Sequence, residues 1–194
     1  TVRCTIYIYM GQAENALHQH QTPLSPLPVR GNSTDTAQTT VISSDPLTAL
    51  LLIGHSNTGK SPLGERIERA FSTSQGRYIH CDFGGLLRRA CAGAIDVGFA
   101  AAEIEAIRTF MDGRVLDRGT FFVARRLLQW LLSESAFDPA RDCLVLNGLP
   151  RTLDQARALN DEGVDVSRVV FLDCPVEVAW ERKRQSEAGK EIGR

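Results

Sequence analysis

The amino-acid sequence predicts an α/β protein, with a parallel sheet as the middle layer of a three-layer α/β/α arrangement. From residue 47 onward, short apolar runs alternate with longer amphipathic stretches. The run at 48–53 (TALLLI) is continuously apolar, as is typical of a strand buried on both faces. Strands that alternate with helices imply parallel pairing and helices on both sides of the sheet.

The individual elements follow from periodicity and from their boundary residues. In the first expected helix, Leu63, Ile67 and Phe71 fall on one face, and Pro62 suits a first-turn position. Thr152 followed by Gln155 resembles a capping box that opens a later helix. Strands are expected at 48–53, 77–81, 143–147 and 168–173, and helices at 61–73, 84–92, 99–112, 120–134, 153–160 and from Pro175 to about 188.

The chain divides near residue 46. Residues 1–10 alternate apolar and polar side chains, which predicts a strand. Residues 11–46 are rich in Gln, Thr, Ser and Pro, so they bury little apolar surface and are predicted to form a flexible low-complexity segment. Residues 47–194 are long enough for one domain with a full core.

Composition excludes several classes of function. With 43% hydrophobic and 23% charged residues, the chain has the profile of a soluble globular protein. A net charge of -1 gives no electrostatic reason to expect nucleic acid or a membrane as a partner. The five cysteines are odd in number and have no C-x-x-C spacing, which argues against a disulfide framework or a zinc site. Reduced thiols and the lack of a signal-peptide pattern predict a cytoplasmic location.

The segment 54–61 (GHSNTGKS) matches the phosphate-binding pattern G-x-x-x-x-G-K-[ST] of P-loop proteins. It follows an expected strand and opens an expected helix, the context in which backbone N–H groups point at phosphate oxygens. The alternative is a glycine-rich turn that matches the pattern by chance, and such a turn would not be expected to lie between a strand and a helix. The pattern predicts ATP and Mg²⁺ as ligands, with Lys60 at the β and γ phosphates and Ser61 on the metal. The residues expected to bind the nucleotide are Gly54, Asn57, Thr58, Gly59, Lys60 and Ser61.

A second motif lies at 147–159 (NGLPRTLDQARAL). It resembles the D-G-F-P-R-T-x-x-Q-A-x-x-L segment of adenylate kinases and the related uridylate–cytidylate kinases. Further segments resemble these kinases in the same order over residues 47–194, namely 83–88, 111–116, 171–175 with 181–182, and 189–194. The resemblance implies ATP-dependent phosphoryl transfer to a nucleoside monophosphate, in a protein that is monomeric at full length.

The resemblance also assigns roles to basic residues. Arg88 and Arg151 are implied to hold the acceptor phosphate, and Arg182 and Arg194 to close on the donor. Together with Lys60 they form the implied catalytic set. Such a set suits the chemistry, because phosphoryl transfer needs positioning and charge neutralisation. Arg89 is an alternative to its neighbour Arg88, and the other basic residues beside Arg182 are alternatives to it.

The acceptor is implied to lie against Phe83, Val115 and Gly148, and Gln155 is implied to read its base. Two of these assignments have structural alternatives. Phe83 either stacks on a base or fills space in the core. Gln155 either reads the base or caps the helix that follows Thr152.

The sequence departs from the kinase pattern around the metal. Asn147 stands where the kinases have Asp, and Gly85 replaces the Asp of T-G-D. The expected metal contacts are Ser61 and Asn147, the latter either directly or through water. Asp82 is either a substitute acid or a plain turn residue. A nucleotide-binding protein without turnover is therefore an alternative function, as is another small-molecule kinase of the same fold.

The chain stops where these kinases continue into a lid, a further strand and a final helix. The resemblance therefore predicts a parallel sheet that lacks its last strand, so that the strand at 168–173 has a bare edge. Truncation is the favoured explanation. The alternative is that the strand at 1–10 pairs at this edge.

Overall fold

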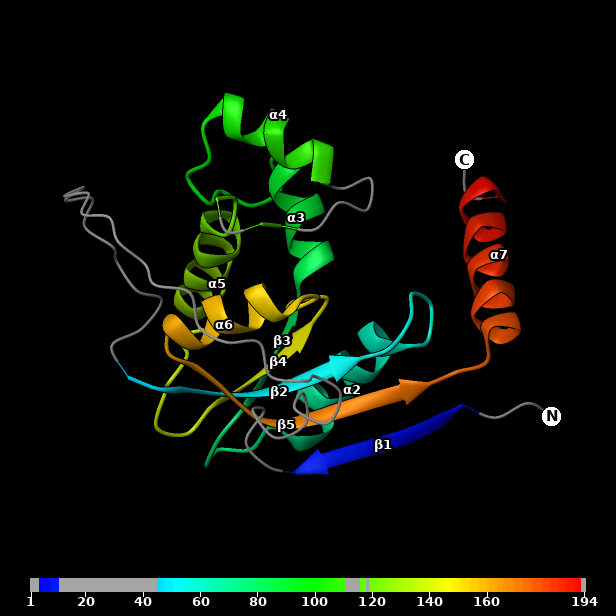
Figure 1. Cartoon of the computed structure of the whole chain (residues 1–194), viewed down its shortest axis with the longest axis horizontal. Helices are drawn as coiled ribbons and strands as arrows, with labels where there is room; N and C mark the ends of the chain where they lie inside the picture. Colours follow the sequence, from blue (N-terminus) through cyan, green and yellow to red (C-terminus); the bar gives the residue numbers. More distant parts are fainter. Residues whose placement is uncertain (1–3, 11–44, 111–115, 118, 193–194) are drawn as a thin grey trace, which may run out of the picture.

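The computed structural model describes residues 4–10, 45–110, 116–117 and 119–192. Its described part contains a five-stranded, mostly parallel sheet and six helices, which make an α/β fold (Figure 1). The strand order is β1-β5-β2-β4-β3. The strands are β1 (Thr5–Met10), β2 (Leu47–Ile53), β3 (Tyr78–Asp82), β4 (Cys143–Asn147) and β5 (Val164–Asp173).

The helices agree with the sequence pattern within a few residues at most boundaries. They are α2 (Lys60–Phe71), α3 (Phe83–Cys91), α4 (Ala101–Phe110), α5 (Phe122–Glu134), α6 (Leu153–Asp161) and α7 (Val176–Ile192). The largest difference among the strands is β5, which begins at Val164 instead of 168. Its first residues pair in parallel with β2, where Leu47 is opposite Val164. The sequence did not predict the first part of β5, because residues 164–167 alternate with polar side chains and do not form an apolar run.

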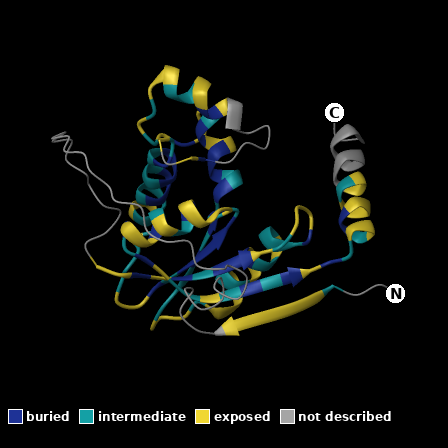
Figure 2. Cartoon of the chain, in the orientation of Figure 1, coloured by how far each residue is buried: buried dark blue, intermediate teal, exposed yellow. Residues whose placement is uncertain are grey.

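The expectation of a bare edge on β5 is wrong for this structure. β1 pairs with β5 in antiparallel orientation, from Thr5 opposite Asp173 to Met10 opposite Arg168. The sheet is therefore mixed and not wholly parallel. Ring stacking of Tyr7 on Phe171, with centroids 6.3 Å apart, adds a side-chain contact to the strand pairing. β1 is nevertheless exposed along its length, whereas the central strands are buried (Figure 2).

Buried apolar side chains lie on both faces of the sheet. Ala49 and Leu51 of β2 belong to a large cluster with residues of α3, α5 and α6. Leu52, on the other face, belongs to a smaller cluster against which Leu63 and Ile67 of α2 pack. This alternation along β2 explains its continuous apolar sequence, because both faces of the strand are covered.

The helix α2 lies close against β3, and a glycine makes this approach possible. A Cβ atom at Gly64 would lie 2.2 Å from Nε2 of His80. The imidazole of His80 is thus packed against helix backbone, and its Nε2 atom has no hydrogen-bond partner among the described residues. Burial lowers the pKa of His80 from its ordinary value, so the neutral ring is favoured in this position.

Several expectations fall outside the described residues. These are the flexible segment over 11–44, the site residues Val115 and Arg194, and most of the segment 111–116. Within the described part of the chain, no helix is both long and apolar enough to cross a membrane.

Candidate functional site

The loop between β2 and α2 has the backbone conformation that its sequence requires. Asn57 and Gly59 have positive φ values of 62° and 101°, and Gly54 has a φ of 150°. A Cβ atom at Gly54 would lie 2.7 Å from the carbonyl oxygen of Leu172 in β5. Glycine is needed at Gly54 for space and at Gly59 for the left-handed turn that leads into α2.

Lys60 is the first residue of α2, and its side chain turns back to the loop. Its Nζ atom donates hydrogen bonds to the carbonyl oxygens of Gly54 and His55, at 2.7 and 2.6 Å. Thr58, which is 3% exposed, donates from Oγ1 to the same His55 oxygen at 2.9 Å. The loop is therefore closed by side-chain contacts to its own carbonyls.

The ammonium of Lys60 is in an electrostatically unfavourable place. Burial lowers its pKa first, and the nearby positive charge of Arg151 lowers it further, while Asp82 acts in the opposite direction. No carboxylate of the described residues lies within ion-pair distance of Lys60, Arg88 or Arg151. These three cations lie on one part of the molecule, and an anionic ligand there would favour the charged form of Lys60.

Ser61, in the first turn of α2, meets Asn147 and Asp82 at the carboxyl ends of β4 and β3. Nδ2 of Asn147, at the end of β4, donates to Oγ of Ser61 at 2.9 Å. The same Ser61 hydroxyl donates to Oδ2 of Asp82, at the end of β3, at 3.3 Å. Asp82 also caps α3, because its Oδ1 accepts a hydrogen bond from Gly85 N at 3.2 Å. The contacts of Asp82 are thus compatible both with a substitute acid near the metal position and with a turn residue. The sequence motifs did not specify its hydrogen bond with Ser61.

Oxygen atoms dominate this cluster, and it contains a single carboxylate. No group of three or more His, Cys, Asp or Glu side chains among the described residues forms a metal-binding set. A hydroxyl, an amide and one carboxylate nevertheless suit Mg²⁺, which is usually bound through one or two carboxylates together with substrate phosphates and water. Ser61, Asn147 and Asp82 therefore fit a magnesium ion that arrives with a polyphosphate.

Arg151 and Arg88 converge on the turn after β4. Nε of Arg151 donates to the carbonyl oxygen of Gly148 at 3.0 Å. Gly148 has a φ of 86°, and a Cβ atom there would lie 3.9 Å from both Nη2 of Arg151 and the backbone nitrogen of Gly84. A Cβ at Gly84 would in turn lie 3.4 Å from Nη1 of Arg88. The two exposed guanidinium groups thus flank one glycine-lined turn.

The neighbour of Arg88 points elsewhere. The guanidinium carbon of Arg89 lies 5.5 Å from the centre of the Trp130 ring on α5. This is a cation–π contact on the outside of the helix pair. Of the two adjacent arginines, Arg88 is the one beside the strand ends.

Gln155 is buried, and both polar atoms of its side chain make hydrogen bonds within the chain. Its backbone N–H donates to Oγ1 of Thr152 at 3.2 Å, which is the helix cap that the sequence predicts. Its side-chain Oε1 accepts from Arg151 N at 2.6 Å, and its Nε2 donates to the carbonyl oxygen of Leu116 at 2.8 Å. Gln155 therefore links α6 to the segment after α4, and base reading by this amide would require these bonds to be exchanged.

Two further predicted site residues have distinct surroundings. Phe83 is 5% exposed and belongs to the main apolar cluster, so its ring fills space in the core. Arg182 on α7 lies beside the loop, where its Nη1 donates to the carbonyl oxygen of Thr58 at 2.9 Å. The loop and α7 are therefore connected by a hydrogen bond between residues far apart in the sequence.

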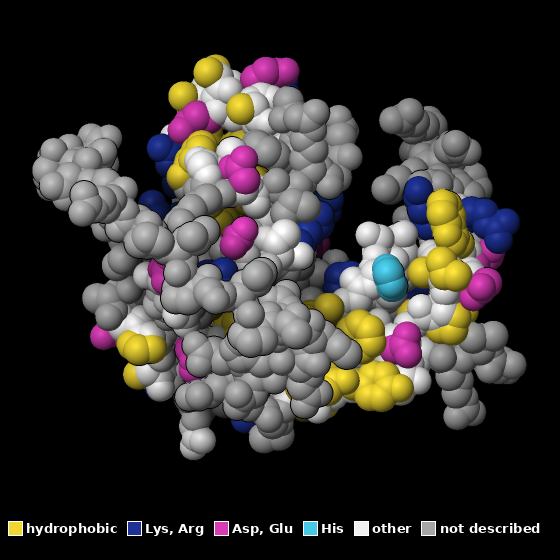
Figure 3. Space-filling view, viewed as in Figure 1, with side chains coloured by type: hydrophobic (Ala, Val, Ile, Leu, Met, Phe, Trp, Pro, Cys, Tyr) yellow, Lys and Arg dark blue, Asp and Glu magenta, His cyan; other side chains and the backbone are white. Residues whose placement is uncertain are grey.

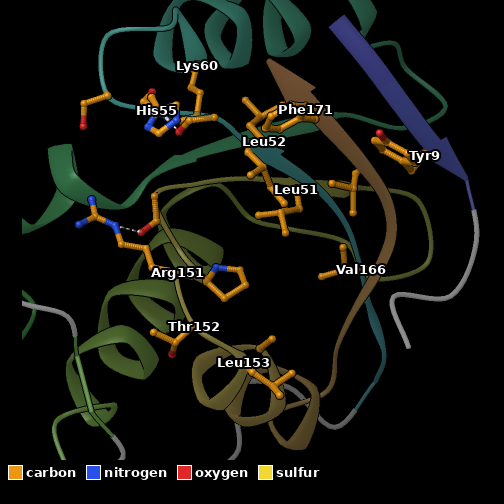
Figure 4. A pocket seen from close by; sticks show the side chains of 17 residues that line it. Tyr9, Leu51, Leu52, His55, Lys60, Arg151, Thr152, Leu153, Val166 and Phe171 are labelled. Atoms are coloured by element: carbon orange, nitrogen blue, oxygen red, sulfur yellow. Dashed lines mark hydrogen bonds between the residues drawn. The ribbon is translucent and has the colours of Figure 1, made fainter. Parts of the chain in front are cut away.

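A cavity of about 820 Å³ opens next to these residues (Figure 4). Lys60, His55 and Arg151 line one part of it, and apolar side chains from β2, β5 and α6 line the rest. Figure 3 shows hydrophobic side chains along the β1–β5 edge of the sheet and on α7. A polar part beside an apolar part is typical of a small-molecule site.

Comparison with known proteins indicates a distant relationship. No family model matches the chain. Adenylate kinase 8 from Rattus norvegicus is 29% identical over 128 residues, which cover 64% of this chain and 24% of that protein. The chain therefore spans about a quarter of the length of this relative. It has a distant adenylate kinase-like relationship, in agreement with the adenylate kinase part of the resemblance noted in the sequence.

Proposed function

We propose that this chain has the three-layer P-loop fold, binds MgATP at the loop Gly54–Ser61 and transfers a phosphoryl group to a nucleoside monophosphate. The observation that carries the proposal is the convergence of Lys60, Arg88 and Arg151 on the carboxyl ends of the parallel strands, where the described residues supply no ion-pair partner. Ligands of open α/β sheets bind at this end of the strands. The adenylate kinase-like relationship supports the same activity. A cytoplasmic location remains a prediction.

On the donor side, the loop supplies backbone N–H groups and the start of α2 for the triphosphate. Lys60 Nζ, now bonded to two loop carbonyls, would exchange them for β and γ phosphate oxygens. Arg182 lies close enough to Thr58 to reach a donor bound on the loop. Arg194 is proposed for the same role by resemblance alone.

On the acceptor side, Arg88 and Arg151 would hold the phosphate of the monophosphate by charge-assisted hydrogen bonds. The acceptor oxygen is already ionised, so no strong general base is required at the site. This agrees with a site in which the positive charges outnumber the acids. We propose that Gly148 and, by resemblance alone, Val115 lie beside the rest of the acceptor. The core position of Phe83 favours its space-filling alternative, and Gln155 would have to exchange its present bonds to read a base.

Ser61, Asn147 and Asp82 would hold the magnesium ion, Asn147 by way of water. The ion would neutralise charge on the phosphate oxygens during transfer. The protein residues would orient the polyphosphate against it and exclude bulk water.

Nucleotide binding without turnover is a second candidate. It is favoured by Asn147, a buried amide that is 4% exposed at the place where the kinases have a carboxylate. One acid, Asp82, is then left near the metal position. The two candidates share the donor site and differ in whether the acceptor site is productive.

A coupled assay of diphosphate formation, run with ATP, Mg²⁺ and a panel of nucleoside monophosphates, tests the proposal. Calorimetry with ATP on the same preparation separates the two candidates. Diphosphate formation with one or more monophosphates supports the kinase. ATP binding with no product from any monophosphate supports the binding protein, and no ATP binding contradicts both.

A further inference from the structure

Two cysteines are neighbours across the mixed edge of the sheet. The antiparallel register places Thr5 opposite Asp173, so one further step places Cys4 opposite Cys174. The two thiols are hydrogen-bond partners, and this bond is the first cause of a raised pKa at Cys174, followed by burial. No disulfide is present, and both residues are free thiols.

The strand geometry is compatible with a covalent bond at this pair. Opposite residues of antiparallel strands have Cα atoms about 4.5–5.5 Å apart. Disulfides span Cα separations of about 4.4–6.8 Å. Cys4 and Cys174 are the next residues beyond the ladder that ends at Thr5 and Asp173, a position in the register that suits a disulfide.

The other three cysteines have no such neighbour in the sheet register. Cys81 is fully buried and Cys143 lies at the start of β4, opposite Tyr78 of β3. Cys91 ends α3. Burial raises the pKa of the Cys81 thiol to about 12, and its partner in the strand register is Leu146, which offers no second thiol.

We propose that Cys4 and Cys174 form a reversible disulfide site that fastens β1 to the edge of the sheet. β1 buries little apolar surface, since Ile6 and Ile8 are 54% and 64% exposed, so its attachment depends mainly on strand pairing with β5. A bond at its first residues would convert this weak attachment into a covalent one. The proposal does not depend on the proposed kinase activity.

The oxidant is a small-molecule disulfide such as oxidised glutathione. The half-exposed Cys4, as thiolate, attacks one sulfur of the small disulfide and releases one glutathione thiolate. Cys174 then loses its proton to solvent and attacks the Cys4 sulfur of the mixed disulfide, which releases the second glutathione. Two protein thiols are oxidised to one disulfide, and one glutathione disulfide is reduced to two thiols.

The site is also connected to the candidate functional site. Cys174 Sγ lies 3.8 Å from Nη1 of Arg182, which donates to the carbonyl oxygen of Thr58 in the loop. The cross-link would hold Cys174, two residues before the start of α7, the helix that carries Arg182. Oxidation therefore fixes the β1 edge and the start of α7 together.

The first test is peptide mapping after equilibration of the whole chain with oxidised glutathione. Trypsin cleavage at arginine places the two thiols in peptides 4–30 and 169–182, so the disulfide appears as one linked peptide that reduction separates. We expect this linked peptide in the monomer fraction. A glutathione adduct at Cys4 without the linked peptide, or a cross-link between two copies of the chain, would overturn the proposal.

Matched variants give a second readout. In the wild-type chain, oxidation should raise Tm by about 5–15 °C and slow hydrogen exchange of residues 5–9. Cys4→Ser and Cys174→Ala should lose both effects, and the control Cys91→Ser should keep them. Equal oxidation-dependent shifts in Cys4→Ser and in the wild type would show that another pair is responsible and would contradict the assignment.

Discussion

The donor and acceptor sides of the candidate site are built in different ways. On the donor side, positive backbone φ values at Asn57 and Gly59 and bonds from Lys60 to loop carbonyls fix the geometry within eight consecutive residues. On the acceptor side, Arg88 and Arg151 come from α3 and from the turn after β4, and both are exposed. The donor side is therefore a local structure, whereas the acceptor side depends on how distant elements pack.

This difference predicts which substitutions affect one ligand and which affect both. A local loop that holds the triphosphate is needed for every step. An exposed arginine on the acceptor side is needed for the second substrate alone. Substitutions on the two sides should therefore differ in their effects on ATP affinity and on acceptor kinetics.

Lys60→Met should abolish phosphoryl transfer and raise the Kd for ATP at least about tenfold, because a methionine supplies no charge to the phosphates. Calorimetry with MgATP and the coupled assay measure the two effects. Lys183→Met is the control, since Lys183 lies on α7 against the Trp180 ring. Unchanged ATP affinity in Lys60→Met would contradict the phosphate-loop assignment.

Arg151→Ala should lower kcat/KM by roughly two to four orders of magnitude and raise the KM of the acceptor, with ATP affinity nearly unchanged. An arginine just before a helix is unfavourable to the helix dipole, so an anionic ligand explains its presence better than helix stability does. Steady-state kinetics over the monophosphate panel measure the effect.

The control for Arg151→Ala is Arg157→Ala, on the exposed side of α6 beside Asp154. It should leave kinetics unchanged. Unfolding of Arg151→Ala would assign the residue a structural role. If kcat/KM of Arg151→Ala equals that of the wild type for every monophosphate, the proposed role of Arg151 in binding the acceptor is wrong.

The sequence predicted that the loop 54–61 lies between a strand and a helix, for a physical reason. The loop motif and its flanking strand and helix are adjacent in the chain, so local rules determine them. β4 was predicted at its observed bounds, because an apolar run covered on both faces has a clear signature. The helix cap at Thr152 follows from residues three positions apart.

Long-range features were predicted poorly. The antiparallel pairing of β1 with β5 joins residues more than 150 positions apart, and the length of the intervening segment had argued against it. The approach of Asp82 to Ser61 depends on the packing of α2 against β3, which sequence patterns do not specify. Asp82 was detectable only as an acid at the end of a predicted strand.

Gly64→Ala should lower the free energy of unfolding by about 1–3 kcal/mol, because the new methyl group would overlap the imidazole of His80. Chemical denaturation measures the change. In the double variant with His80→Ala, the ring is absent and most of the Gly64→Ala penalty should disappear. A full penalty in the double variant would mean that backbone strain, and not the contact between α2 and β3, limits this position.

Asn147→Asp should have the smallest effect and is the sharpest test of the metal position. Asn147 is buried and donates to the Ser61 hydroxyl, whose own hydrogen is directed to Asp82. An aspartate there would accept from Ser61 and compete with Asp82 for that hydrogen. It would also place a second carboxylate near the first, so the ligand-free protein should be less stable and the Mg²⁺ concentration for half-maximal activity should fall by roughly tenfold. Activity against Mg²⁺ concentration and Tm with and without MgATP measure the two effects.

Asn160→Asp, on the exposed side of α6, is the control. If Asn147→Asp leaves the Mg²⁺ requirement unchanged, Asp82 is the acid that orders the metal, and Asp82→Asn should then raise that requirement more than Asn147→Asp lowers it.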